Sequence, residues 1–144
     1  MKTTTIKAKD IKRVWYLVDL KNQVLGRVTT DIATKLIGKN KVTFSPNLDC
    51  GDYVVCINAA DIQVTGNKAE DKMYQHHTMH PGGLREINFA NLMEKDPRKV
   101  IIHAISGMLP KNKLRDERLK RLKIFVDANH PYEQQLTKLE KKEQ

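Results

Sequence analysis

The segment between residues 14 and 58 reads as a strand, a helix and a second strand, and this order constrains the fold more than any other feature. Val14–Asp19 is a mostly apolar run of strand-forming residues, as expected for a strand covered on both faces. Apolar residues then recur at helical spacing, at Val24, Val28, Ile32 and Leu36. Gly38 supplies a stop for this helix.

The remainder of the chain continues the alternation of strands and helices. We expect a second buried strand over Tyr53–Asn58 and a weaker one near Lys72–His76. Helical patterns follow over Asn88–Lys95 and Pro97–Ser106, and Leu122–Val126 alternates like a strand. These elements predict an α/β fold of three layers, α/β/α, with a mostly parallel central sheet of about four strands and extended basic termini.

The length of 144 residues fits a single domain, and no linker rich in Gly, Ser or Pro divides the chain. We therefore expect one domain over residues 1–144. A polar N-terminal arm covers residues 1–12, and a C-terminal tail covers residues 129–144. The tail has few apolar residues, so it should run over a surface or stay loose unless a partner orders it.

Positive charge is concentrated at the two ends of the chain. Residues 1–48 carry a net charge of +7, residues 49–96 of −4 and residues 97–144 of +6. This distribution favours nucleic acid as the first partner to consider. No long apolar run predicts a membrane span, and the first 13 residues lack the apolar region of a secretory signal, so we expect a cytosolic protein. Cys50 and Cys56 are expected to be buried, reduced thiols.

The densest basic segment follows a break at Gly107 and Pro110. Seven Lys or Arg residues lie between Lys111 and Lys123, and only Asp116 and Glu117 offset them. Asn112 can cap the short helix that this segment predicts. Such a surface suits a polyanion such as RNA, which releases counterions when Lys and Arg neutralise its phosphates. The alternative is a helix face that is simply solvated.

Signatures of enzymes that bind nucleotides or use an activated serine are missing from the sequence. The turn after the first strand has no glycine-rich loop, and no Gly-x-x-x-x-Gly-Lys-Ser/Thr or Gly-x-Ser-x-Gly motif occurs. Asp49 and Asp52 flank a turn and could form a carboxylate pair, but Asx turns entering a strand explain them as well.

Histidines form the best candidate for a metal site. His76, His77 and His80 lie close together, but Pro81 and the glycines after it argue for a loop, and no Cys or His-Glu-x-x-His pattern completes a zinc site. We therefore expect no metal and no cofactor. Loop histidines that contact a phosphate or a base are the more consistent interpretation if RNA is bound.

Several strings in order along the chain resemble the L13 family of large-subunit ribosomal proteins. They are Trp15–Asp19, Leu25–Arg27, Gly38–Lys41, Pro46–Asp52, Asn58–Ala59, Thr65–Lys68 and His80–Gly83. The most specific string is Gly107-Met108-Leu109-Pro110, followed by a basic stretch and a strand. The resemblance runs from about Lys12 to Gln135.

The resemblance implies a three-layer α/β protein without catalytic activity. It would bind large-subunit ribosomal RNA, join the particle early in assembly beside neighbouring ribosomal proteins, act in the cytoplasm, and need neither membrane nor small-molecule substrate. Carried over by position, the expected RNA-contacting residues are Arg27, Lys35, Lys39, Lys41, His76, His77, Arg85, Lys111, Lys113, Arg115, Arg118, Lys120 and Arg121.

The chain departs from the family pattern at two places. Relatives usually carry Leu-Gly-Arg where this chain has Leu114-Arg115-Asp116, which leaves the local backbone shape open because Gly tolerates positive φ and Arg does not readily. The C-terminal His-x-x-Ala-Gln-Gln appears here as 130–135 with Glu133 in place of Ala. Two other functions stay possible from the sequence: an α/β enzyme acting on a nucleotide or other anion through Asp49, Asp52 and the histidine loop, and a free RNA-binding regulator.

Overall fold

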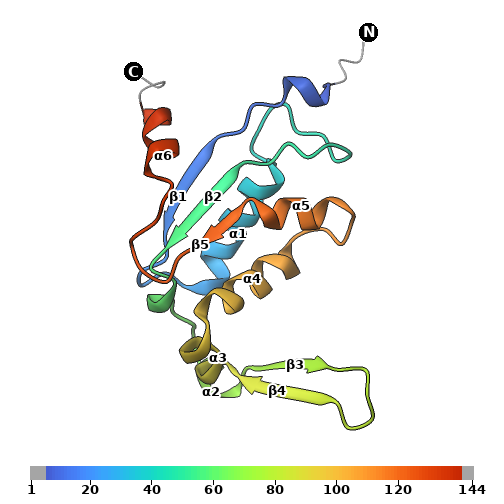
Figure 1. Cartoon of the computed structure of the whole chain (residues 1–144), viewed down its shortest axis with the longest axis vertical. Helices are drawn as coiled ribbons and strands as arrows, with labels where there is room; N and C mark the ends of the chain where they lie inside the picture. The colour runs from blue at the N-terminus through green and yellow to red at the C-terminus, as the bar shows by residue number, and fades with distance from the viewer. Residues whose placement is uncertain (1–5, 141–144) are drawn as a thin grey trace.

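The computed structural model describes residues 6–140, and its centre is a parallel sheet (Figure 1). In the described part of the chain this sheet consists of β1 (Trp15–Asp19), β2 (Tyr53–Ile57) and β5 (Leu122–Ile124), in the order β1-β2-β5. Both pairings are parallel, with Tyr16 opposite Val54 and Val54 opposite Leu122. The predicted α/β fold with a mostly parallel sheet is confirmed.

Helix α1 (Leu25–Ile37) connects β1 to β2 and buries one face against the sheet. Val28, Ile32 and Leu36 are buried on that face, as their spacing predicts. The helix ends at Gly38, whose φ of 78° is the left-handed conformation that glycine adopts without strain. A side chain at this position would also clash, because its Cβ atom would lie 2.6 Å from the carbonyl oxygen of Cys50.

Helix α4 (Pro97–Met108) packs against α1 and completes the core. Asp96 caps it by accepting a hydrogen bond from the Arg98 amide, and Pro97 occupies the first helical position, where its missing N–H costs nothing. Val100, Ile101 and Ile105 on this helix are fully buried. The core thus lies between the sheet and the α1–α4 pair.

The segment after β2 forms a separate hairpin. After the short helices η2 (Ala59–Asp61) and α2 (Lys68–Asp71), β3 (Met73–His77) pairs antiparallel with β4 (Leu84–Asn88), and neither joins the parallel sheet. The expected sheet of about four strands therefore has three. Six residues separate β3 from β4, which suffices for a hairpin but not for the longer crossover that parallel pairing needs.

Helix α3 (Phe89–Lys95) follows the hairpin and matches the helical pattern predicted there. In Figure 1 the hairpin projects from the rest of the molecule beyond α3. Most of its side chains are exposed, so it offers two surfaces for contacts outside the chain.

The opposite face of the sheet is covered by the C-terminal segment. Helix α5 (Leu114–Lys120) leads into β5, and α6 (Glu133–Glu140) then lies against β1. Trp15 stacks between Tyr53, at 4.3 Å between ring centroids, and Tyr132, at 5.2 Å. Side chains alternate along a strand, so Trp15 lies on the face away from the core residue Val18. The C-terminal segment with α6 therefore forms the third layer, on the face of the sheet opposite α1 and α4.

The predicted arms extend beyond the described residues at both ends. Residues 1–5 of the N-terminal arm and 141–144 of the tail lie outside them, and the rest of the N-terminal arm contains only the short helix η1 (Ala8–Asp10). Within residues 6–140, no helix combines the length and the apolar character that crossing a bilayer requires.

Candidate nucleic-acid interface

The turn between α4 and α5 presents a group of exposed cations. Lys111, Lys113 and Lys120 are exposed and Arg115 is half-buried, and none of them forms an ion pair with a described carboxylate. Asn112 fixes the turn, because its side-chain oxygen accepts a hydrogen bond from the Leu114 amide at 3.2 Å. The N-cap of α5 is Lys113, so Asn112 holds the turn just before the helix and does not occupy the cap position predicted for it. We refer to Lys111, Lys113, Arg115 and Lys120 as the α5 cations.

The two remaining arginines of this segment point into the protein. Only 1% of Arg118 and 5% of Arg121 is exposed. Arg121 donates to both carboxylate oxygens of Asp49, one of them at 2.6 Å, and to the carbonyl oxygen of Leu36 at 3.1 Å. Arg118 Nε lies 3.7 Å from the same carboxylate. Their expected contact with RNA phosphates is revised, because both guanidinium groups are enclosed beside Asp49.

Lys41 also stabilises the fold through contacts within the protein. Its ammonium group donates to Asp52, to the carbonyl oxygen of Lys12 at 2.8 Å and to that of Cys50 at 3.1 Å. Three acceptors use all three donors of an ammonium group, so the expected phosphate contact at Lys41 is revised as well. Asp52 is fully buried and also accepts from the Val14 amide at 2.8 Å.

This placement removes the carboxylate pair from any catalytic arrangement. Asp49 and Asp52 precede β2 at its amino end, whereas ligands of open α/β sheets bind beyond the carboxyl ends of the strands. Both carboxylates are engaged by cations of the same chain. The Cys56 thiol is buried as expected, and this burial raises its pKa to about 12.

The other cations predicted near α1 lie in different environments. Lys39 is exposed in the loop after Gly38, and Arg27 is exposed in the first turn of α1. The ammonium group of Lys35 lies 4.9 Å from the centroid of the Tyr16 ring, a cation–π contact that holds it against the sheet.

The hairpin brings together three of the predicted residues. His76 on β3 lies directly opposite Arg85 on β4, and His77 is the next residue along β3. All three are exposed. His77 Nδ1 accepts a hydrogen bond from the Met79 amide at 3.0 Å, which orients its ring. No cluster of three potential metal-ligating side chains occurs among residues 6–140.

Arg115 replaces the glycine of the family pattern without strain. It lies within α5, and the described non-glycine residues with positive φ are Asn22, Asn58 and Met79. The helix therefore accepts a side chain here, and the substitution adds a cation to the surface.

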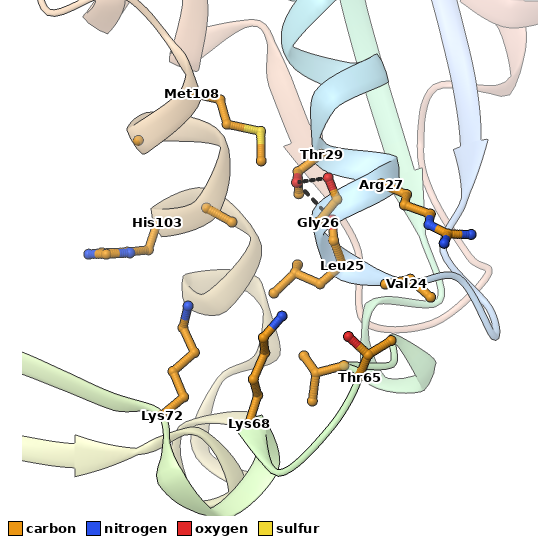
Figure 2. A pocket seen from close by; sticks show the side chains of 13 residues that line it. Val24, Leu25, Gly26, Arg27, Thr29, Thr65, Lys68, Lys72, His103 and Met108 are labelled. Carbon is orange, nitrogen blue, oxygen red and sulfur yellow. Dashed lines mark hydrogen bonds between the residues drawn. The ribbon is translucent and has the colours of Figure 1, made fainter.

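Sequence reasoning missed a cavity bordered by two lysines. Lys68, on α2, and Lys72, just after it, both line this cavity, and Figure 2 shows Lys68 pointing toward the space between α1 and α4. The string Thr65–Lys68 marked this region only as part of a resemblance. The lining residues on α1 and α4 are far from Lys68 in the sequence, so no local pattern indicates the cavity.

Together, these features define a class of protein. A rigid α/β core holds exposed cations on a turn, a loop and a projecting hairpin, and the candidate catalytic carboxylates are used to hold the fold together. This arrangement is typical of a structural RNA-binding protein, in which Lys and Arg contact phosphates.

Comparisons with known proteins agree with this class and specify the family. A model of the family described as ribosomal protein L13 matches residues 13–131. The large ribosomal subunit protein uL13 of Geobacter sulfurreducens is 51% identical over 139 residues, covering 96% of this chain and 97% of the relative. That of Bordetella pertussis is 49% identical over 138 residues, with the same coverage. That of Clostridioides difficile is 49% identical over 132 residues, covering 92% of each. The chain belongs to the ribosomal protein L13 family, and it is a ribosomal protein, not an enzyme.

Proposed function

We propose that this protein binds large-subunit ribosomal RNA in the cytoplasm, and that it supports early assembly of the subunit beside neighbouring ribosomal proteins. The observation that carries the proposal is the group of α5 cations: three are exposed, Arg115 is half-buried, and none has a described carboxylate partner. Cations without an internal partner lose no ion pair when a phosphate approaches, so the counterions released from RNA contribute their full effect.

The position of these cations is fixed by the buried charge cluster behind them. Arg118 and Arg121 connect α5 and the start of β5 to Asp49, and Asp49 precedes β2. In Figure 1 the α4–α5 turn, the loop after α1 and the hairpin all extend toward the same side of the molecule. Lys39, His76, His77 and Arg85 therefore extend the proposed surface, while Arg27 and Lys35 remain predicted RNA contacts outside these three segments. Phosphate contacts of this kind set orientation and not sequence preference.

Salt dependence of RNA binding tests this proposal. Binding to deproteinised large-subunit RNA is measured by filter retention over a range of KCl concentrations for the wild type and for Lys111→Gln combined with Lys113→Gln. We expect the slope of log K against log salt to flatten by about 0.7–0.9 per lost contact. The control is Lys21→Gln, which removes an exposed charge elsewhere and should leave the slope nearly unchanged. Equal slopes for all three proteins would contradict the proposed surface.

A free RNA-binding regulator is the second function compatible with these cations. A regulator would use the same surface, but it would bind RNA outside the ribosome. Sedimentation of the protein with large subunits separates the two functions.

A further inference from the structure

A cavity of about 530 Å³ lies between the first turn of α1 and the last turns of α4, with α2 at its lower edge (Figure 2). Part of its wall is apolar, formed by Leu25 and Val64 on one side and by Ala104 and Met108 on α4. Its size falls within the range of pockets that hold small ligands. None of the residues that line it is acidic.

Two lysines give the cavity a positive entrance. In Figure 2 the side chain of Lys68 points into the space between α1 and α4, and that of Lys72, at the rim of the cavity, runs up beside α4 below His103. The guanidinium group of Arg27 points away from the cavity. Lys72 Nζ lies 5.5 Å from the centroid of the Tyr74 ring, which positions its charge. Lys68 forms no ion pair within the part of the chain that the structure describes.

The two helices that form the walls each place a glycine at the cavity. Gly26 lies in the first turn of α1 and Gly107 in the last turn of α4, and neither has positive φ. A Cβ atom on either would meet no heavy atom within 4 Å beyond its own helical surroundings. Glycine in a helix costs about 0.5–1 kcal/mol relative to alanine, so the folded chain alone gives no reason for either residue.

Glycine also permits close approach of a ligand to the backbone. The amide of Gly26 faces no acceptor among the described residues, so it is available as a donor at the same place. A ligand that fits this cavity has a flat apolar part for the walls and a negative group for Lys68 and Lys72. A nucleotide has both.

We infer that the cavity receives one nucleotide, with its base between α1 and α4 and its phosphate at Lys68 and Lys72. This inference rests on the proposed function, because unpaired positions of the bound ribosomal RNA supply such nucleotides. RNA-binding proteins commonly recognise bases that are splayed out of single-stranded loops and bulges. A free nucleoside monophosphate has the same chemistry, so it is the other ligand that could occupy the cavity.

The inference is tested with a substitution that fills the cavity without destabilising α4. Gly107→Leu places a side chain in the open space and introduces a better helix former, so the unfolding free energy should not fall. Asn91→Leu is the matched control, because Asn91 is exposed on α3 and does not line the cavity. Each protein is bound to deproteinised large-subunit RNA, and the bases are probed chemically.

We expect the wild type and Asn91→Leu to protect one unpaired base that Gly107→Leu leaves reactive. Loss of this contact should weaken RNA binding roughly 5-fold, the low end of the range for one stacked base, because no Phe, Tyr or Trp lines the cavity. The inference is overturned if Gly107→Leu gives the same affinity and the same pattern of protection as the wild type. Failure of the wild type to bind the RNA at all would instead contradict the proposed function.

A second arm distinguishes the two sources of the nucleotide. AMP and then UMP are titrated into the protein without RNA, and the amide resonances of Gly26 and Gly107 are followed by NMR. Saturation only at millimolar concentration, together with base protection in RNA, identifies the RNA as the source. Saturation at micromolar concentration identifies a free nucleotide as the ligand. Absence of any shift and of any base protection overturns the inference.

Discussion

Asp49 is the centre of the buried charge cluster, and its removal should strongly destabilise the protein. Its carboxylate accepts two hydrogen bonds from Arg121, lies 3.7 Å from Arg118 Nε and 3.4 Å from Arg13 Nη2. The substitution Asp49→Asn keeps the size of the side chain and removes its charge. Two arginines would then be enclosed without a neutralising carboxylate.

The expected loss follows from the burial of these side chains. The side chain of Arg118 is 2% exposed, that of Arg121 6% and that of Asp49 9%. Removing one partner of a buried ion pair costs about 3–5 kcal/mol, because the other charge stays buried without compensation. The free energy of unfolding of a small domain is about 5–15 kcal/mol, so this variant would lose a large part of its stability.

Urea denaturation followed by circular dichroism measures the effect. With a slope of about 2 kcal/mol per molar urea, the midpoint should fall by roughly 2 M. Asp31→Asn removes an exposed carboxylate from α1 and should shift the midpoint little. In a protein that already carries Arg118→Leu and Arg121→Met, Asp49→Asn should cost much less, since no buried cation is stranded. Equal midpoints for Asp49→Asn and Asp31→Asn would refute the reasoning.

Three further predictions concern other parts of the fold. Asp96→Ala removes the cap of α4 and should lower the unfolding free energy by about 0.5–2 kcal/mol at neutral pH, measured by urea denaturation. A hydrogen bond from the Arg98 side chain lowers the pKa of Asp96 below its ordinary value of 3.8. The difference in unfolding free energy between the wild type and Asp96→Ala should therefore persist above pH 4 and shrink as the pH falls through the lowered pKa. A constant difference down to pH 2 would contradict this prediction. Because burial raises the pKa of Cys56 to about 12, iodoacetamide at pH 8 should alkylate this thiol only after unfolding, as mass spectrometry can show. Tyr132→Ala should uncover Trp15, the one tryptophan of the chain, and shift its fluorescence to longer wavelength; an unchanged spectrum would mean that the tail does not cover the sheet in solution.

The central part of the fold could be predicted because its signals are local. The apolar run before Asp19 and the helical spacing up to Leu36 each lie within one element, and Gly38 ends the helix as expected. The hairpin was harder to recognise. Its second strand, Leu84–Asn88, has apolar residues only at Leu84 and Ile87, three positions apart, so it lacks the alternation that indicates a strand.

The inward arginines could not be predicted, for a different physical reason. Arg118 and Arg121 stand in a charge run whose local sequence is typical of a solvated surface. Their partner Asp49 precedes Arg121 by 72 residues, and only the pairing of β2 with β5 brings them together. Whether a lysine or arginine binds RNA or holds the core therefore depends on contacts that no local spacing shows.

Sedimentation of cell extract through a sucrose gradient tests the central claim most directly. The protein is detected across the gradient by an antibody or a small tag, at low salt and after a high-salt wash. The protein should sediment with large subunits and larger particles, and the variant Lys111→Gln with Lys113→Gln should dissociate from them at lower salt than the wild type. A protein that stays at the top of the gradient under all conditions, apart from ribosomal particles, would contradict the account.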